Sequence, residues 1–202
     1  NRGPLLIERS LQSCLAQTYK NIEVVIVGDH CTDDTAALVT AVKDPRVRFV
    51  NREERGQYPE DKMLRWMVAG SIPMNDALRL ARGSFVTHLD DDDEHAPDRI
   101  ERLVAFAKNT RADFIWHPFD VEHADGSWTR NEAASFGYGR VTTSSVFYHR
   151  VWKEIEWDPQ CFLLKEPGDW NRFRKIRWLG ARVARYPVSM LKHYRERSQF
   201  GR

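Results

Sequence analysis

The sequence is short of cysteine, has no long hydrophobic run and carries almost no excess of either charge. Its three cysteines are far apart and form no C-x-x-C pair, so it predicts neither a disulfide framework nor a zinc site and fits a reducing compartment. No apolar run approaches the roughly 20 residues that a membrane-spanning helix needs. The chain is therefore predicted to have no transmembrane segment.

The charge balance limits the kinds of partner to expect. Lysine and arginine number 31 against 29 acidic residues, which leaves a formal net charge of +2 and no electrostatic reason to expect nucleic-acid binding. Hydrophobic residues make up 42% and charged residues 30% of the 202 residues. Those values are typical of one ordinary globular domain and exclude a disordered chain.

Helical and strand-like segments alternate along much of the chain. We expect strands at 22–27, 47–50, 84–89, 113–119, 144–148 and 182–186, and helices after Pro4, at 35–42 and 73–81, and from Pro97 and Gly168. Residues 51–62 and 123–140 are expected to be loops. The alternation predicts an α/β fold with a mostly parallel sheet.

A run of four aspartates and a glutamate, residues 90–94, follows the strand expected at 84–89. Crowded carboxylates repel each other, which raises their pKa unless a cation neutralises them. Ligands of open α/β sheets bind at the carboxyl ends of the strands, and Mg²⁺ takes one or two carboxylates together with substrate phosphates. The run therefore predicts either a divalent metal site or a solvated acidic turn that caps the helix beginning near Pro97.

Two further acidic segments give weaker local signals. Asp29 lies in the loop 28–34, where one carboxylate can orient a nucleotide base or the loop can simply cap the next helix. Gly168-Asp169-Trp170 is typical of a helix start in which the aspartate caps free N–H groups and the tryptophan enters the core. Neither segment identifies an activity by itself.

Taken together, three segments resemble the inverting glycosyltransferases of family 2, which have the GT-A fold. Residues 10–27 resemble the opening of that family. Residues 83–99, with Leu-Asp-Asp-Asp-Asp-x-x-x-Pro-Asp-Arg, resemble its metal-binding D-x-D segment, and 168–170 resemble the motif that carries its general base. The three segments occur in the expected order and span almost the whole chain.

The resemblance also implies a domain organisation. It implies one GT-A domain over 1–202 with a mostly parallel central sheet, a nucleotide-sugar-binding part at 1–120, and an acceptor-binding and catalytic-base part at 121–202. The family's first strand would lie just upstream of Asn1. We therefore expect that residues present in the natural protein precede the numbered sequence, because a parallel sheet without that strand would have unpaired backbone groups at its centre.

For catalysis and metal binding, the resemblance implies specific residues. Asp169 is the implied general base, with Glu166 as the fallback. Asp92 is the implied metal ligand, with Asp91 as the competing choice and His193 as a further candidate.

For the donor, the resemblance implies a second set of residues. Nucleotide contacts are implied for Asn1, Arg2, Asp29 and Asp90, and a contact with the donor sugar for Asp93. The loop around Asp29 departs from the family pattern. Gly28 stands at its first acidic position, and His30-Cys31 replace Gly-Ser.

The implied function is metal-dependent, inverting transfer of a sugar from a nucleotide-sugar to a hydroxyl of a carbohydrate or glycolipid acceptor. A UDP-sugar is the expected donor, Mn²⁺ or Mg²⁺ the expected cofactor, and surface polysaccharide or glycolipid synthesis the expected setting. The expected location is the cytoplasm, with a peripheral position at the inner membrane face as the alternative. Two other functions stay open: a sugar-nucleotide nucleotidyltransferase, and a non-catalytic member of the fold that binds a nucleotide or glycan.

Overall fold

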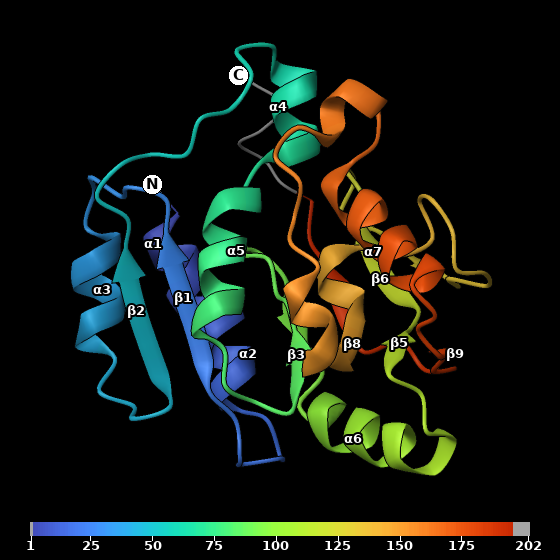
Figure 1. Cartoon of the computed structure of the whole chain (residues 1–202). Coiled ribbons are helices and arrows are strands. Elements are labelled where there is room, and N and C mark those ends of the chain that lie inside the picture. Colours follow the sequence, from blue (N-terminus) through green and yellow to red (C-terminus); the bar gives the residue numbers. More distant parts are fainter. Residues whose placement is uncertain (1, 196–202) are drawn as a thin grey trace. The chain divides into compact units, whose positions relative to one another are not determined.

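The computed structural model describes residues 2–195 of the chain (Figure 1). These residues form two compact units, each assembled from separate stretches of sequence. The first unit contains Asn21–Val86 and Tyr148–Ala181, and the second contains Arg2–Lys20, Thr87–Phe147 and residues 182–195. The predicted division into a nucleotide-sugar-binding part, 1–120, and an acceptor-binding part, 121–202, describes function. The compact units do not test it, so it stays a prediction.

Short helices and strands alternate through both units. The α-helices are α1 Gly3–Leu5, α2 Gln12–Leu15, α3 Thr35–Ala41, α4 Lys62–Val68, α5 Ser71–Leu80, α6 Arg99–Thr110 and α7 Gly168–Trp178. The π-helix η1 Leu6–Leu11 joins α1 to α2, and the 3-10 helices are η2 Thr143–Ser145, η3 Arg150–Glu154 and η4 Cys161–Leu164. The strands are β1 Val24–Gly28, β2 Val47–Asn51, β3 Phe85–Thr87, β4 Glu94–His95, β5 Phe114–Trp116, β6 Phe119–Glu122, β7 Trp128–Asn131, β8 Val146–His149, β9 Val183–Arg185 and β10 Leu191–His193.

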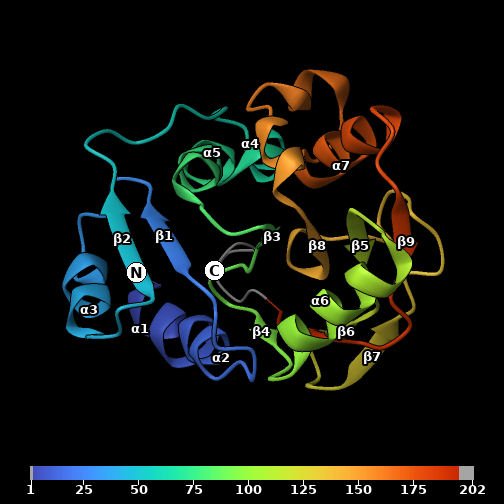
Figure 2. The same ribbon diagram turned by 60° about the horizontal axis from the view of Figure 1, so that its bottom comes forward.

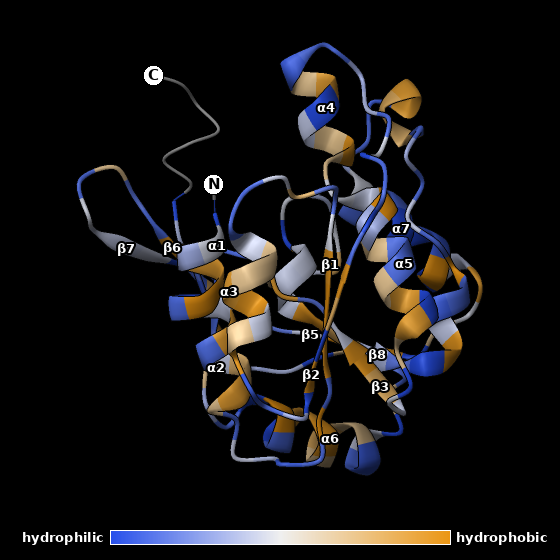
Figure 3. Ribbon diagram, turned by 90° about the vertical axis from the view of Figure 1, so that its left-hand side faces the viewer, coloured by the Kyte–Doolittle hydropathy of each residue, from blue (hydrophilic) through white to orange (hydrophobic). Residues whose placement is uncertain are grey.

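In the first unit, β1 and β2 form a two-stranded parallel sheet in which Val24 lies opposite Val47. β1 is a continuous hydrophobic stretch, as its β-branched residues predict (Figure 3). Helix α3 packs beside β2, and α5 packs beside β1. Among residues 2–195, β1 has a strand partner on one side. The strand expected upstream of Asn1 stays a prediction.

The other strands form two four-stranded sheets. One has the order β4-β10-β6-β7, with β10 parallel to β6 and antiparallel to β4. Strands β4, β6 and β7 of this sheet are labelled in Figure 2. The second has the order β3-β8-β5-β9, with β5 and β9 parallel. The core of the second unit contains the fully buried side chains of Leu103, Phe114 and Val146. The predicted α/β class is confirmed, and its strands are grouped in three sheets.

The loop predicted at 123–140 contains a strand. β7 pairs antiparallel with β6, and the turn between them is built around Gly126, whose φ of 81° favours glycine. The Ser127 N–H donates to Asp125 Oδ1 at 2.9 Å, which closes the turn. The Asp-Gly pair is a hairpin signal that the sequence prediction did not use, and the strand predicted at 113–119 is in fact divided between β5 and β6.

Helix α4 was not predicted, because the charged residues before it are typical of a loop. Asp61 begins the helix, since its Oδ1 accepts hydrogen bonds from the N–H groups of Met63 and Leu64, both at 2.9 Å. Gly70, with a φ of 77°, separates α4 from α5. Within residues 2–195, none of the helices has the length and apolar character that a bilayer crossing requires.

Candidate active site

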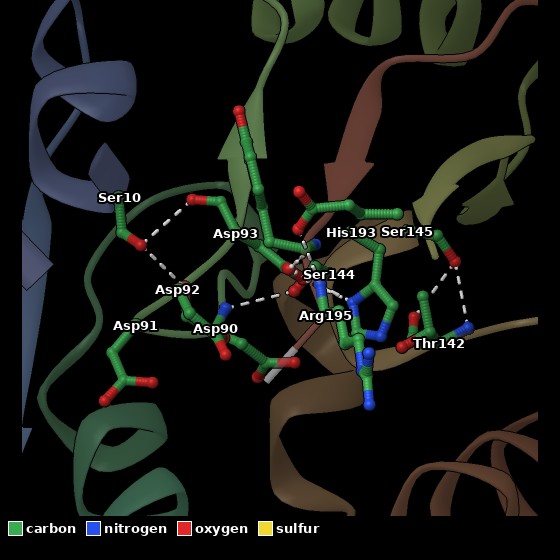
Figure 4. A network of polar contacts seen from close by, with 12 residues as sticks. Ser10, Asp90, Asp91, Asp92, Asp93, Thr142, Ser144, Ser145, His193 and Arg195 are labelled. Atoms are coloured by element: carbon green, nitrogen blue, oxygen red, sulfur yellow. Dashed lines mark hydrogen bonds and ion pairs between the residues drawn. The ribbon is translucent and has the colours of Figure 1, made fainter. Parts of the chain in front are cut away.

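The aspartate run begins three residues after the end of β3, in a turn that is held by elements distant in sequence (Figure 4). The Asp93 N–H donates to the Asp90 carbonyl at 3.2 Å. The Ser10 hydroxyl lies 2.8 Å from the Asp90 carbonyl oxygen and 2.9 Å from that of Asp93, and the Asp90 N–H donates to Ser144 Oγ at 3.0 Å. Because Ser10 comes from η1 and Ser144 from η2, the backbone of the turn is fixed independently of its carboxylates.

Asp93 is the most enclosed carboxylate of the run, and its side chain is fully buried. It accepts hydrogen bonds from His193 Nδ1 at 3.0 Å and from the Tyr194 N–H at 3.1 Å. Burial acts to lower the pKa of His193, but the hydrogen bond to Asp93 and the neighbouring negative charges outweigh it and raise that pKa to about 9. The imidazolium therefore neutralises the buried Asp93.

Asp90 responds to the same crowding in the opposite way. Burial, and then the charge of Asp93, raises the pKa of the Asp90 carboxyl to about 8. The charges of the neighbouring aspartates act in the direction that the sequence predicts for crowded carboxylates, although burial is the larger cause. One carboxyl of the run, that of Asp90, therefore has a raised pKa, and another, that of Asp93, contacts the His193 ring.

Asp91 and Asp92 converge on one positive charge. Arg2 Nη2 lies 2.6 Å from Asp91 Oδ1 and 2.7 Å from Asp92 Oδ2. The Asp92 side chain is 11% exposed and that of Asp91 43%, so the interaction with Asp92 is the less screened of the two. A point where two carboxylate oxygens meet a cation suits a hard divalent ion.

The carboxylates at this point fit a divalent cation whose coordination shell is completed by the substrate. Among residues 2–195, no group of three or more histidine, cysteine, aspartate and glutamate side chains could hold a metal ion. Asp91 and Asp92 supply the one or two carboxylates that Mg²⁺ takes when phosphates and water fill its other positions. The residues present therefore fit a divalent cation bound together with a diphosphate.

Two residues beside the turn were not predicted as site residues. The guanidinium of Arg9 lies 3.6 Å from the centre of the Tyr194 ring, and Arg9 Nη1 donates to the Asp92 carbonyl at 2.7 Å. The Tyr194 hydroxyl donates to Glu94 Oε2 at 2.8 Å. No local pattern could have identified these contacts, because they join residues about 80 to 185 positions apart in sequence.

In the first unit, Asp29 follows the carboxyl end of β1. Its Oδ1 accepts a hydrogen bond from the Gly56 N–H at 2.8 Å and lies 3.4 Å from Arg52 Nε. The same loop is fixed to β2 by Asn51, whose side chain accepts from the Cys31 N–H at 2.8 Å and donates to the Cys31 carbonyl at 2.9 Å. Asp29 thus holds loop backbone, and its side chain is 23% exposed.

The fit of Gly28 explains why this loop departs from the family pattern. A Cβ atom at Gly28 would lie 2.6 Å from Asn51 Oδ1 and 2.9 Å from Cys31 Sγ. Asn51 cannot move cheaply, because its side chain is tied by two hydrogen bonds to the backbone of Cys31. An aspartate at this position would therefore require a different loop.

Asp169 lies in the first turn of α7, which begins at Gly168 with Pro167 in the cap position. The N-cap position is therefore Pro167 rather than Asp169, but the helix-start interpretation holds in part, because Asp169 Oδ1 accepts a hydrogen bond from the first-turn N–H of Trp170 at 2.6 Å. Burial raises the pKa of the Asp169 carboxyl to about 6, and only backbone hydrogen bonds oppose the rise. Among residues 2–195, Asp169 has no partner in an ion pair.

Glu166 has the opposite environment, although it lies three positions away. Arg174 donates to it through Nε at 2.8 Å and Nη2 at 2.6 Å, and Asn171 Nδ2 donates at 2.7 Å. The hydrogen bonds from Arg174 are the main cause of a lowered pKa at Glu166. Glu166 is therefore committed to holding the start of α7 in place.

The candidate residues fall into two groups. The second unit brings together Arg2, His193 and the aspartates 90–93. The first unit contains Asp29, Glu166 and Asp169. Asn1 lies outside the described residues.

Comparison with known sequences decides the family. The sequence model of glycosyl transferase family 2 matches residues 1–59 and 68–174, a range that contains Asp29, the aspartate run and Asp169. The chain belongs to glycosyl transferase family 2. The unmatched residues 60–67 correspond almost entirely to α4, and His193 lies beyond the matched range.

Several curated proteins are similar to parts of this family 2 chain. It is 35% identical over 120 residues to the succinoglycan biosynthesis protein ExoO of Rhizobium meliloti, a match of 59% of this chain and 31% of ExoO. It is 30% identical over 116 residues to the UDP-Glc:alpha-D-GlcNAc-diphosphoundecaprenol beta-1,3-glucosyltransferase WfaP of Escherichia coli, a match of 57% of this chain and 41% of WfaP. The matches thus span less than half of these relatives' own length.

Solved structures of S. aureus TarS have the same fold as this family 2 chain. TarS in complex with UDP superposes with a TM-score of 0.74 at 18% identity, over 99% of this chain and 59% of that one. The structure with UDP-GlcNAc superposes with the same TM-score over 96% of this chain and 55% of that one. The predicted GT-A fold is confirmed.

Proposed function

We propose that this family 2 chain is the sugar-transferring domain of an inverting glycosyltransferase. In this proposal, it moves a sugar from a nucleotide-sugar to a hydroxyl of a carbohydrate or glycolipid acceptor during surface polysaccharide or glycolipid synthesis. The observation that carries the proposal is the family match, because it includes Asp29, the aspartate run and Asp169. The names of ExoO and WfaP support the setting in polysaccharide assembly.

A UDP-sugar is the donor that we propose. UDP and UDP-GlcNAc are bound in the TarS structures, and UDP-Glc appears in the name of WfaP. Asn1, Arg2, Asp29 and Asp90 are the proposed nucleotide contacts, and Asp93 the proposed contact with the donor sugar.

Asp92 is the residue that we propose to hold a divalent cation, Mn²⁺ or Mg²⁺, with Asp91 as its neighbour. When bound, the ion supplies positive charge that stabilises a leaving nucleoside diphosphate. Arg2 already bridges the two carboxylates, so it is positioned to exchange its carboxylate partners for phosphate oxygens when the ion binds. His193 keeps the charge of the buried Asp93 compensated in this scheme.

Asp169 is the proposed general base. Its pKa of about 6 leaves it mostly ionised at neutral pH, yet more basic than an ordinary aspartate, which suits proton removal from an acceptor hydroxyl. Glu166, the fallback, is less suitable because its charge is shared with Arg174 and its pKa is lowered. One carboxylate base is sufficient for a single displacement that inverts the anomeric carbon, and no covalent intermediate is needed.

Substitution of the base gives the test. We expect Asp169→Asn to lower sugar transfer by about 10²- to 10⁴-fold while UDP binding, measured by calorimetry with Mn²⁺, stays at the wild-type value. Asp158→Asn is the matched control, because Asp158 also lies in the first unit but forms a surface ion pair with Lys175. Near wild-type transfer by Asp169→Asn would show that the base lies elsewhere, and the absence of transfer by the wild type would favour a non-catalytic binding protein.

A further inference from the structure

A cleft of about 800 Å³ lies in the first unit, and none of the proposed catalytic or donor residues lines it. Its walls come from the beginning of β2, from the end of α5 and the turn that follows it, and from η3 with the residue before it. A volume of this size lies within the range of roughly 300–1,000 Å³ that is typical of small-molecule sites.

The lining of this cleft is strongly basic. Five of its ten lining residues are arginine or lysine, and one, Glu154, is acidic. Two of the five basic side chains are already paired: Arg48 with Glu23 at 3.1 Å, and Arg79 with Asp76 at 2.7 Å. Arg48 and Arg79 therefore form part of the cleft wall but add little net positive charge to it.

Among residues 2–195, the remaining three cations have no ion-pair partner, although Glu154 lies in the same lining. Arg82 and Arg150 are exposed, and among residues 2–195 neither side chain is in an ion pair. Lys153 is half-buried and donates from Nζ to the Ala81 carbonyl at 3.0 Å, so a backbone contact holds it in the wall while its charge has no acidic partner. The three positive charges therefore favour an anion in the cleft.

The backbone brings the two arginines together. The Arg150 N–H donates to the Ser84 carbonyl at 2.9 Å, which fixes the start of η3 beside the turn that carries Arg82. The Arg82 N–H donates in turn to Glu23 Oε1 at 2.6 Å. Both positions are thus set by the fold, while the guanidinium groups stay available to a ligand.

The cleft is separate from the donor residue of the same unit. Arg48 is the second residue of β2, whereas Asp29 follows the carboxyl end of β1, and the two strands are parallel with Val25 opposite Arg48. The two positions therefore lie towards opposite ends of a strand pair about 15 Å long. A ligand in the cleft would not occupy the nucleotide site.

We infer that this cleft binds the phosphate group of a phosphate ester, carried either by a small molecule or by a lipid headgroup. Arginine presents a planar fork of N–H donors that matches phosphate, and a lysine adds a point charge. The apolar lining residues Leu80, Ala81 and Val151, the last 56% exposed, give the organic part of the ester a surface to contact. The basic residues line one open cleft rather than a stripe along the surface, which suits a single phosphate or diphosphate.

Binding of pyrophosphate, measured by calorimetry in EDTA, tests the inference, because without divalent cations the aspartate run repels the anion. The variant Arg82→Glu/Arg150→Glu is expected to bind pyrophosphate more than about tenfold more weakly than the wild type. The control, Arg111→Glu/Arg140→Glu, makes the same change of charge at two exposed arginines of the second unit and is expected to bind normally. Equal thermal unfolding of the variants would show that folding is not the cause.

A second arm distinguishes the source of the phosphate. Each variant is sedimented with vesicles of phosphatidylcholine, with and without phosphatidylglycerol. If the wild type binds vesicles but not pyrophosphate, and Arg82→Glu/Arg150→Glu no longer binds vesicles, the ligand is a lipid headgroup. If the wild type binds pyrophosphate and the variant loses only that binding, the ligand is a soluble ester. Equal weakening in both double variants, or no binding of either probe by the wild type, would overturn the inference. Sugar transfer plays no part in these readouts, so they are independent of the proposed activity.

Discussion

The aspartate run after β3 and the first turn of α7 both carry candidate catalytic carboxylates, but they manage charge in different ways. In the run, Arg2 contacts Asp91 and Asp92, and His193 contacts Asp93. At the start of α7, Arg174 compensates Glu166, whereas Asp169 has no ion-pair partner within residues 2–195. The first arrangement prepares a site for positive charge, and the second keeps one carboxylate basic. A group of charges and a single unpaired charge therefore suit different parts of one reaction.

The largest effect should separate the two neighbours in the run. Asp92→Asn is expected to weaken UDP binding in the presence of Mn²⁺ by about 100-fold or more, because its carboxylate is the more enclosed of the pair that faces Arg2. Asp91→Asn should weaken it by less than about fivefold, since solvent screens the more exposed carboxylate. Calorimetry with and without Mn²⁺ measures both. The reverse order would make Asp91 the ligand, and equal binding without metal would contradict the metal assignment.

The next effect tests whether the buried charge of Asp169 destabilises the folded protein. Its pKa is raised from 3.8 to about 6 in the folded state, so the protein loses stability as the pH rises through about 6 and retains it below about 4. At pH 7, Asp169→Asn should therefore have a free energy of unfolding up to about 3 kcal/mol higher than the wild type. This gain in stability should vanish near pH 4. Asparagine keeps the oxygen that accepts the Trp170 N–H.

Glu166→Gln is the natural comparison in the same denaturation series. It removes half of an ion pair, so it should destabilise the protein at neutral pH rather than stabilise it. A destabilised Asp169→Asn variant would mean that the carboxylate contributes to folding, and the contrast between the two regions would fail.

The smallest effect concerns the loop that carries Asp29. Gly28→Ala should cost about 1–3 kcal/mol of folding free energy, because the added Cβ meets Asn51 Oδ1 at 2.6 Å. Gly137→Ala is the control, since its Cβ would meet only Ser135 Oγ at 3.8 Å, an ordinary contact. Urea denaturation of both variants gives the comparison. Equal stabilities would show that the loop can relax around the methyl group and that Gly28 is not required by its packing.

Local pattern was enough to predict most of the elements. The β-branched run of β1, the aspartates after β3 and the start of α7 at Gly168 were all recognised from sequence. Helix α4 and strand β7 were missed because their signals are a single capping aspartate and a single Asp-Gly turn. Such short signals compete with the polar character of the segments around them.

The sequence by itself determined the α/β class and the likeness to family 2, because both depend on the order and composition of contiguous segments. Only the tertiary structure decided which carboxylate of each acidic segment is paired. Arg2, Ser10, Ser144 and His193 reach the aspartate run from distant parts of the chain, and Arg174 selects Glu166 rather than Asp169. The basic cleft likewise depends on residues 48, 82 and 150 meeting in space. Charge compensation is a matter of distance through space, and a sequence records only distance along the chain.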